Sequence, residues 1–224
     1  MKERPILFSA PMVRAILAGA KTQTRRDATR VGGFGQITEF GRSDTTGYDW
    51  HFRDSAMRWH DLSHAQLMKA CPYGQVGDRL WVRETWQYAD WTEEGEPHIG
   101  YAADDKRILI EDYPETWVKR LEEVWCELSD PKNYDIDNCA ADRRWRPNIH
   151  MPRWACRILL EVTGVRVERL QDISHEDAEL EGVKCNMSAK GFRDHFCDLW
   201  EHLYGAGSWG ANPWVWVIEF RRVK

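Results

Sequence analysis

The sequence lacks the patterns that mark membrane-spanning, secreted and thiolate-metal proteins. No stretch reaches the roughly 20 apolar residues of a membrane helix, and the first residues contain no signal-peptide core. The six cysteines form no Cys-x-x-Cys pair and have no regular spacing, which favours reduced thiols over a disulfide framework. Internal repeats and low-complexity segments are also absent. We therefore expect a soluble, cytoplasmic protein.

An overall basic character is missing too, because the net charge is −5. The charges are nevertheless segregated along the chain. Residues 1–30 and 143–169 each carry seven basic and two acidic side chains, whereas residues 84–142 carry 17 acidic and five basic ones. This pattern disfavours a general nucleic-acid binder. If the two basic segments meet in space, we expect them to form an anion-binding face.

Aromatic residues, by contrast, are plentiful, with 13 tryptophans in 224 residues. A chain of this length can bury a core without metal or disulfide staples, and most of the tryptophans are expected in that core, although flat rings also stack on bases. We expect one domain over residues 1–224, with irregular insertions at about 27–70 and 87–150.

The most informative stretch is Gly19–Arg26, which reads Gly-Ala-Lys-Thr-Gln-Thr-Arg-Arg. It follows a short apolar strand and a helix that Pro11 begins and Gly19 ends. This places Lys21 in a turn and Thr24 in or near the next strand. Residues three apart in a regular strand face opposite sides, so these two side chains can act together only if a turn or bulge re-aims one of them.

The next segments predict mostly irregular structure. His60 and His64 have the i, i+4 spacing of a short helix, but no third ligand falls at a recognised spacing, which favours a solvated helix face over a metal site. Apolar alternation predicts a strand over 79–86, and a helix is expected over 114–128. The segment 145–154 is too rich in proline for regular structure.

The C-terminal third predicts a hairpin, two helices and a final strand. The hairpin pairs 157–162 with 165–170 through Thr163-Gly164. Ser174 is the expected N-cap of a helix that ends at Gly182, with Asp177 at the third helical position of a carboxylate capping box. A second helix is expected over 191–204, with an apolar face, and an aromatic strand over 214–220.

Together these segments resemble the ASCH (activating-signal-cointegrator homology) family of the PUA-like superfamily, in the enlarged form found in bacterial prophages. The resemblance rests on Gly-x-Lys-Thr-x-Thr-x-Arg, a Gly-Asp-x-Leu strand, the short acidic helix and a final Val-Ile-Glu-Phe strand. It covers residues 4–26, 71–86 and 153–222. It implies an α+β fold with a PUA-like β-barrel, flanking helices and two irregular insertions.

A small bacterial member removes the acetyl group from 4-acetylcytidine with a Lys, a Thr and a Glu. The resemblance places the first two on Lys21 and Thr24 and the third on Glu181, with Glu176 and Glu179 as rivals. Chemically, a buried Lys can take the proton of a Thr hydroxyl, which then attacks an acyl carbonyl. The implied function is an amidohydrolase that deacylates a modified cytidine, without a cofactor or metal.

Further residues are candidates for substrate binding. Arg25 and Arg26 could hold a phosphate or a developing oxyanion, and the others are Trp81, Arg83, Glu84 and Arg153. The structural alternative is that Thr24 serves β-propensity and that Arg83 and Glu84 form an ordinary ion pair.

Two other functions stay open at the level of sequence. The same pocket could belong to a non-enzymatic module that binds RNA or a modified base, or to a ribonuclease. The partner is then a modified nucleoside or RNA in each case, and the oligomeric state is not predicted.

Overall fold

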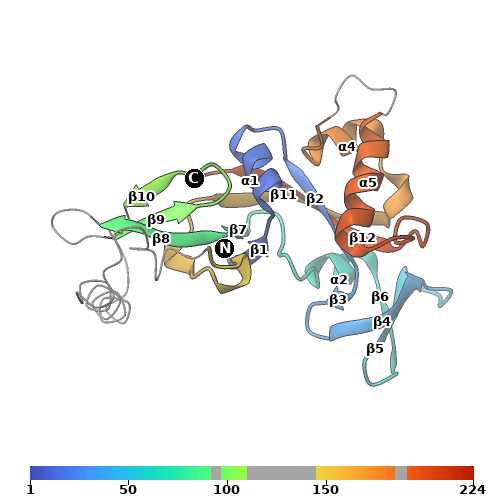
Figure 1. The fold of residues 1–224 in the computed structure, drawn as a ribbon. Helices are drawn as coiled ribbons and strands as arrows, with labels where there is room; N and C mark the ends of the chain where they lie inside the picture. Colours follow the sequence, from blue (N-terminus) through green and yellow to red (C-terminus); the bar gives the residue numbers. More distant parts are fainter. Residues whose placement is uncertain (92–96, 110–144, 185–190) are drawn as a thin grey trace. The chain divides into compact units, whose positions relative to one another are not determined.

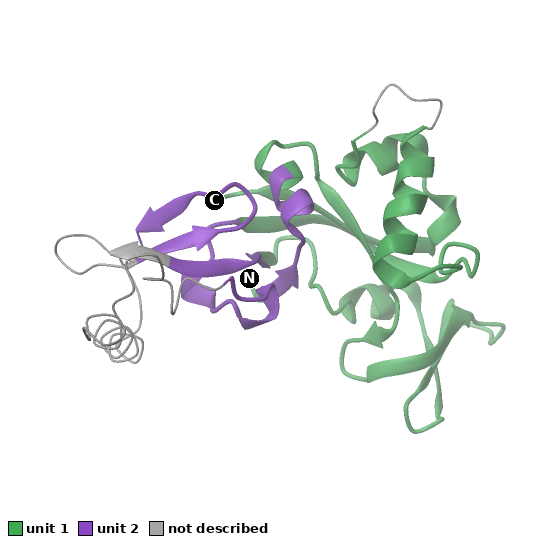
Figure 2. Cartoon of the chain, viewed as in Figure 1, with its two compact units in different colours: residues 1–4, 15–80, 159–224 green, residues 5–14, 81–158 purple. Residues whose placement is uncertain are grey.

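The protein has a mixed α+β architecture built mostly from sheets, with a few short helices (Figure 1). The structure, a computed structural model, describes residues 1–91, 97–109, 145–184 and 191–224. Residue contacts divide the chain into two compact units (Figure 2). Unit 1 comprises residues 1–4, 15–80 and 159–224, and unit 2 comprises residues 5–14 and 81–158. The expected α+β class is confirmed.

The largest sheet has five strands and is open. In spatial order they are β1 (Glu3–Leu7), β7 (Arg79–Arg83), β11 (Leu159–Arg169), β12 (Trp214–Arg222) and β2 (Gln23–Asp27). Strand β7 is internal, as its apolar alternation predicts. None of the sheets in the described part of the chain closes into a barrel, so the PUA-like barrel that the resemblance implies is not confirmed.

The expected hairpin at Thr163-Gly164 is wrong, because residues 159–169 form the single strand β11. It runs antiparallel to β12, and its register shifts between Val162 and Gly164. A Cβ on Gly164 would lie 2.6 Å from the Glu219 Oε2 atom. The glycine therefore marks a bulge and a close side-chain approach rather than a turn.

Residues 27–70, expected to be irregular, contain a four-stranded sheet in unit 1. Its order is β3 (Arg30–Val31), β4 (Gly35–Arg42), β5 (Trp50–Asp54) and β6 (Trp59–Leu62). The expected helix with His60 and His64 on one face is also wrong. His60 lies on β6, and His64 begins α2 (His64–Lys69) after the N-cap Ser63. Several of the Gly and Asp residues that suggested irregular structure lie in the connections between these strands.

Two helices of unit 1 pack against β12. Helix α4 (His175–Leu180) has Ser174 as its N-cap, and the Ser174 hydroxyl accepts the Asp177 N–H, as expected. The Asp177 carboxylate, however, binds arginines rather than completing a capping box. Helix α5 (Phe192–Tyr204) follows. The shared core comprises Leu170, Ile173, Ala178, Phe196, Trp200, Val215 and Val217.

Unit 2 contains α1 up to Arg14, the C-terminal ends of β1 and β7, and a three-stranded sheet. The helix α1 spans Ala10–Leu17, and the sheet order is β10 (Arg107–Leu109), β9 (Pro97–Tyr101) and β8 (Trp86–Trp91). Two 3-10 turns follow, at Asn148–His150 and Arg153–Ala155. The core of this unit includes Trp86, Tyr88, Ile99, Tyr101 and Met151. The helix expected over 114–128 lies outside the described residues.

Within the described ranges, no helix is long and apolar enough to cross a membrane.

Gly182 offers a test of how tightly α4 is held against the Lys21 stretch. Its φ is +77°, and a Cβ there would lie 2.7 Å from the Lys21 Cβ and 2.8 Å from the Ala15 Cβ. We expect Gly182→Ala to lower the free energy of unfolding by about 2 to 5 kcal/mol, from left-handed strain plus overpacking.

Gly19→Ala is the matched control, because Gly19 has a φ of +74° with nothing within 4 Å of the built Cβ. Gly19→Ala should lower the free energy of unfolding by only about 1 to 2 kcal/mol, the cost of left-handed strain without overpacking. Equal losses for the two variants in urea denaturation would contradict the close approach at Gly182.

Candidate functional site

Lys21 is held by backbone contacts from two directions within unit 1. Its N–H donates to the Ala15 carbonyl (3.1 Å), and the N–H of Thr22 donates to the Leu180 carbonyl (2.9 Å). Lys21 also forms an isolated antiparallel bridge with Glu181, the residue after the last turn of α4. The chain must turn back sharply between α1 and β2 for this, and Gly19 permits the turn. The bridge brings two residues 160 positions apart into direct contact.

The Lys21 amine and the Glu181 carboxylate form a buried ion pair. Lys21 Nζ donates to Glu181 Oε2 at 2.6 Å and to the Glu181 carbonyl at 2.9 Å. The two side chains are 0% and 3% exposed. Burial lowers the pKa of the Lys21 amine because a charged group loses its water, and the Glu181 carboxylate opposes that shift only in part. Of the three candidate carboxylates, only Glu181 is buried, whereas Glu176 and Glu179 are exposed.

Arg25 joins the same cluster from β2. Its Nη1 donates to Glu181 Oε1 (3.1 Å), its Nε and Nη2 donate to Glu168 Oε1 (2.9 and 2.6 Å), and its Nη2 also donates to Asp177 Oδ2 (2.9 Å). The Arg25 side chain is 0% exposed. The donors of the Arg25 guanidinium are directed at protein carboxylates. Arg25 is therefore poorly placed to bind the expected phosphate or oxyanion.

Arg166 extends the network toward the surface. It donates to Glu168 (2.9 Å) and Asp177 (2.7 Å), and it pairs with Glu219 of β12. Arg25 and Arg166 come from the two basic segments, so the segments do meet here. Because four carboxylates surround the three cations, the result is an internally neutralised cluster rather than an open anion-binding face.

Strand geometry places Thr24 away from the Lys21 amine. Lys21, Gln23 and Arg25 are spaced by two residues, and all three side chains reach α4 or the residue after it. Side chains alternate along a strand, so Thr24 and its partner Ile218 face the opposite side of the sheet. Thr24 is buried there. A Lys21–Thr24 pair would need a bulge between them, and the regular alternation of these side chains shows none. The role of Thr24 stays a prediction.

Arg26 alternates to the same face as Thr24. Burial raises the pKa of the Tyr204 hydroxyl, and the Arg26 side chain, which hydrogen bonds to it, acts in the opposite direction. Arg26 is therefore tied to the end of α5 and does not join Arg25.

The other candidate residues, Trp81, Arg83, Glu84 and Arg153, belong to unit 2. Glu84 does not pair with its neighbour Arg83, whose Nη2 donates to the Ile149 carbonyl.

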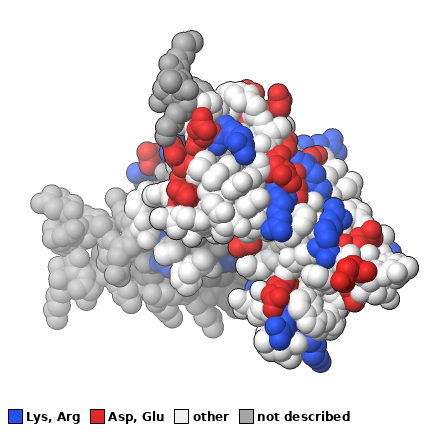
Figure 3. All heavy atoms as spheres, turned by 90° about the vertical axis from the view of Figure 1, so that its right-hand side faces the viewer, with Lys and Arg blue, Asp and Glu red and all other residues white. Residues whose placement is uncertain are grey.

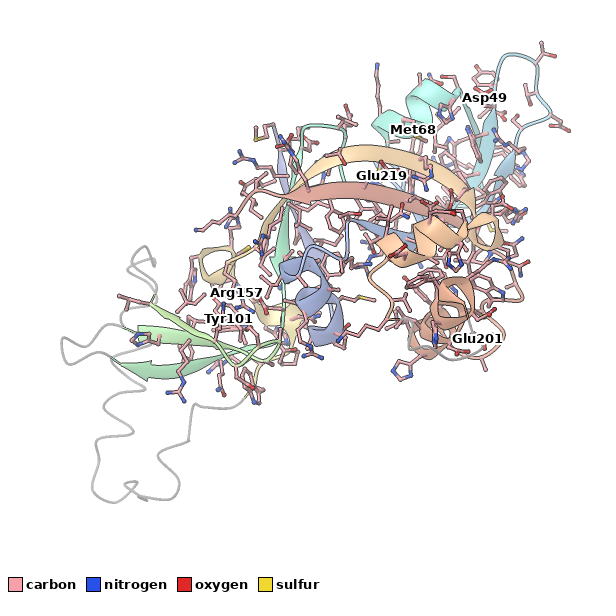
Figure 4. The ribbon with its side chains drawn as sticks, turned by 90° about the horizontal axis from the view of Figure 1, so that it is seen from above. Asp49, Met68, Tyr101, Arg157, Glu201 and Glu219 are labelled. Carbon is pink, nitrogen blue, oxygen red and sulfur yellow. The ribbon has the colours of Figure 1, made fainter. Side chains whose placement is uncertain are left out.

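Glu84 pairs instead with Arg157, which the sequence did not single out. Arg157 donates to both Glu84 oxygens at 2.8 Å, and it also binds Asp104. Its guanidinium carbon lies 4.0 Å from the centre of the Tyr101 ring (Figure 4). Burial raises the pKa of the Glu84 carboxyl, and Arg157 counteracts that shift. Because Glu84 and Asp104 already occupy the Arg157 donors in a bidentate arrangement, this pair leaves Glu84 poorly placed to bind a substrate.

A surface cavity of about 260 Å³ lies on the four-stranded sheet of unit 1, in a segment expected to be irregular. It is lined by Asp44, Thr45, His51, Trp59 and Asp61. The strand register explains this grouping. His51 on β5 pairs with Asp61 on β6, and Asp61 lies two residues after Trp59 on the same strand. Over the described residues, no three His, Cys, Asp or Glu side chains are placed to hold a metal ion.

Comparison with protein-family models, with curated proteins and with solved structures gave no significant match for this chain.

A double-mutant cycle tests whether Lys21 and Glu181 form an energetically coupled pair. Lys21→Met leaves the buried Glu181 carboxylate with Arg25 as its partner, and Glu181→Gln leaves the buried Lys21 ammonium without its carboxylate. Each variant should therefore lower the free energy of unfolding by about 3 kcal/mol or more. The double variant should lose less than the sum of the two, by at least about 1 kcal/mol.

Lys69→Met is the control, because Lys69 is an exposed lysine of the same unit. It should change stability by no more than about 0.5 kcal/mol. Additive losses at positions 21 and 181, measured by chemical denaturation, would show that the two charges are not coupled.

Proposed function

We propose that the protein is an amidohydrolase that removes an acyl group from a modified cytidine of the 4-acetylcytidine type, with Lys21 and Glu181 as the acid–base pair. One observation carries the proposal, namely the 2.6 Å contact between a buried amine and a buried carboxylate. Perturbed, paired ionisable groups of this kind concentrate at functional sites. The resemblance of the Gly19–Arg26 stretch to the ASCH family supports the substrate class and a PUA-like relationship of the fold.

The chemistry needs an amine that gives up its proton more readily than an ordinary lysine. Burial favours this, because it penalises the ammonium form and so lowers the pKa of Lys21. The neutral amine takes a proton from a water molecule, and the water oxygen bonds to the acyl carbon. The bond from that carbon to the exocyclic nitrogen then breaks, and the proton passes from Lys21 to the leaving nitrogen. Glu181 stabilises the ammonium while it lasts, and the products are a carboxylate and cytidine.

Water is the proposed nucleophile, rather than Thr24, because the alternation along β2 turns the hydroxyl to the other face. The mechanism also requires motion. The Lys21 side chain has no exposed surface, so the end of α4 at Glu181 must move away from β2 before an acyl group can reach the amine.

That burial favours one alternative, a non-enzymatic module that binds RNA or a modified base. In this alternative the cluster of Lys21, Arg25 and Glu181 only fastens α4 to the sheet. It would then be a structural element in a binding protein, and no substitution in it would alter any chemistry.

Purified protein incubated with 4-acetylcytidine should release cytidine, and chromatography can measure the product. Lys21→Met and Glu181→Gln should reduce the rate at least about 100-fold, the usual contribution of a general acid or base. The rate should rise with pH through the pKa of Lys21, at a value below the 10.5 of an unperturbed lysine, because only the neutral amine accepts a proton.

Thr24→Val is the matched variant. It should retain most of the activity if water is the nucleophile, and lose it if the threonine hydroxyl is. Circular dichroism must show that each variant is folded. A folded wild type that releases no cytidine would overturn the proposal and favour the binding module.

A further inference from the structure

Two arginines of unit 1 stack on the same tryptophan, far along the chain from one another. Arg169 ends β11 and is the register partner of Trp214. Arg42 ends β4 and is the register partner of Trp50. The Arg42 guanidinium carbon lies 3.9 Å from the Trp50 ring centre and 5.8 Å from that of Trp214. The Arg169 guanidinium carbon lies 4.4 Å from the Trp214 ring centre.

The aromatic support beneath these arginines is well packed. Trp50 is fully buried, and it contacts Trp214 edge to face with ring centres 5.0 Å apart. Phe40 stacks on Trp50, with ring centres 5.3 Å apart. The Trp50 indole N–H donates to His64 Nδ1. Cation–π stacking on a fixed ring restricts a guanidinium that would otherwise move freely.

The two positive charges are close together. Both distances are measured to the Trp214 ring centre, so the guanidinium carbons are no further apart than the sum of 5.8 and 4.4 Å. This upper bound is close to the Debye length of about 10 Å at 0.1 M salt, so the repulsion between the two charges is only partly screened.

No carboxylate balances this pair in the described parts of the chain. Arg169 Nη1 donates to the backbone carbonyl of Asn212 at 2.9 Å. Arg42 is exposed, and its contacts among the described residues are with the two rings. Arg25, Arg53, Arg166 and Arg221 of the same unit all form ion pairs with acids.

The space-filling view shows basic and acidic side chains intermixed on the face that it presents (Figure 3). Because other arginines of unit 1 are paired with acids, the unpaired charge of Arg42 and Arg169 suits one or two anionic groups rather than a broad polyanion surface. Planar guanidinium groups match the oxygens of a phosphate and bind them through paired hydrogen bonds.

We propose that Arg42 and Arg169 form a phosphate-binding site, which takes the phosphate of a nucleotide or of a single-stranded nucleic acid. Trp50 and Trp214 hold the two guanidiniums in place, and the exposed donors of Arg42 face the ligand. The site does not depend on the chemistry proposed at Lys21. It shares no residue with the Lys21 cluster, although β11 and β12 contribute to both.

Isothermal titration at low ionic strength tests the site with three probes, inorganic phosphate, cytidine 5′-monophosphate and a short oligocytidylate. Arg42→Gln and Arg169→Gln should each weaken binding of the probes at least about tenfold, the loss expected for a charge-assisted hydrogen bond. Arg53→Gln, which removes an arginine already paired with Glu39, should leave binding unchanged. Arg42→Lys should bind with intermediate affinity, because it keeps the charge without the planar fork.

The probes distinguish the two sources of phosphate. Equal affinity for the nucleotide and the oligonucleotide indicates a single phosphate site. Tighter oligonucleotide binding with a steeper salt dependence indicates a strand.

The proposal is overturned if a folded wild type binds none of the three probes, or if Arg42→Gln and Arg169→Gln bind as tightly as Arg53→Gln. Lys21→Met, if folded, should bind like the wild type, so failure of the hydrolase proposal and failure of this one give different results.

Discussion

The buried ion network around Lys21 and Arg25 is the interaction on which unit 1 depends. Neither cation has exposed side-chain surface, and desolvation of two charges costs several kcal/mol for each ion unless partners replace the lost water. Glu181, Glu168 and Asp177 supply those partners from α4 and β11. The helix α4 must therefore sit on β2 in one register, because any slip would leave a charge buried without a partner.

If the site is catalytic, the same network sets stability against catalysis. Burial lowers the pKa of Lys21, as a general base needs, yet the same burial closes the site. If the protein is an enzyme, its catalytic cycle must break a strong internal contact at Glu181. If it is a binding module, the network needs no such motion, and its value is the fixed position of α4.

The arginines show how environment assigns different roles to one residue type. Arg25 is buried, and each of its contacts is a protein carboxylate or the Phe196 ring. Arg157 likewise fills its donors with Glu84 and Asp104 in unit 2. Arg42 instead rests on an aromatic platform with its donors at the surface. Only this last arrangement leaves hydrogen-bonding capacity for an external anion, which is why the phosphate site is proposed there.

The sequence by itself determined the local features. The α+β class, the turn at Gly19, the strand that follows it, the cap at Ser174 and the strand β7 all follow from short-range preferences of glycine, serine and apolar alternation. It could not determine the sheet in residues 27–70, because its strands are held by register with one another. The resemblance had placed the third residue on Glu181, and burial is what separates Glu181 from the exposed Glu176 and Glu179. The continuous strand at Gly164 depends on pairing with β12 and on the close approach of Glu219. Pairing and burial decided these points, and they depend on contacts between separate segments that leave no local signal in a chain.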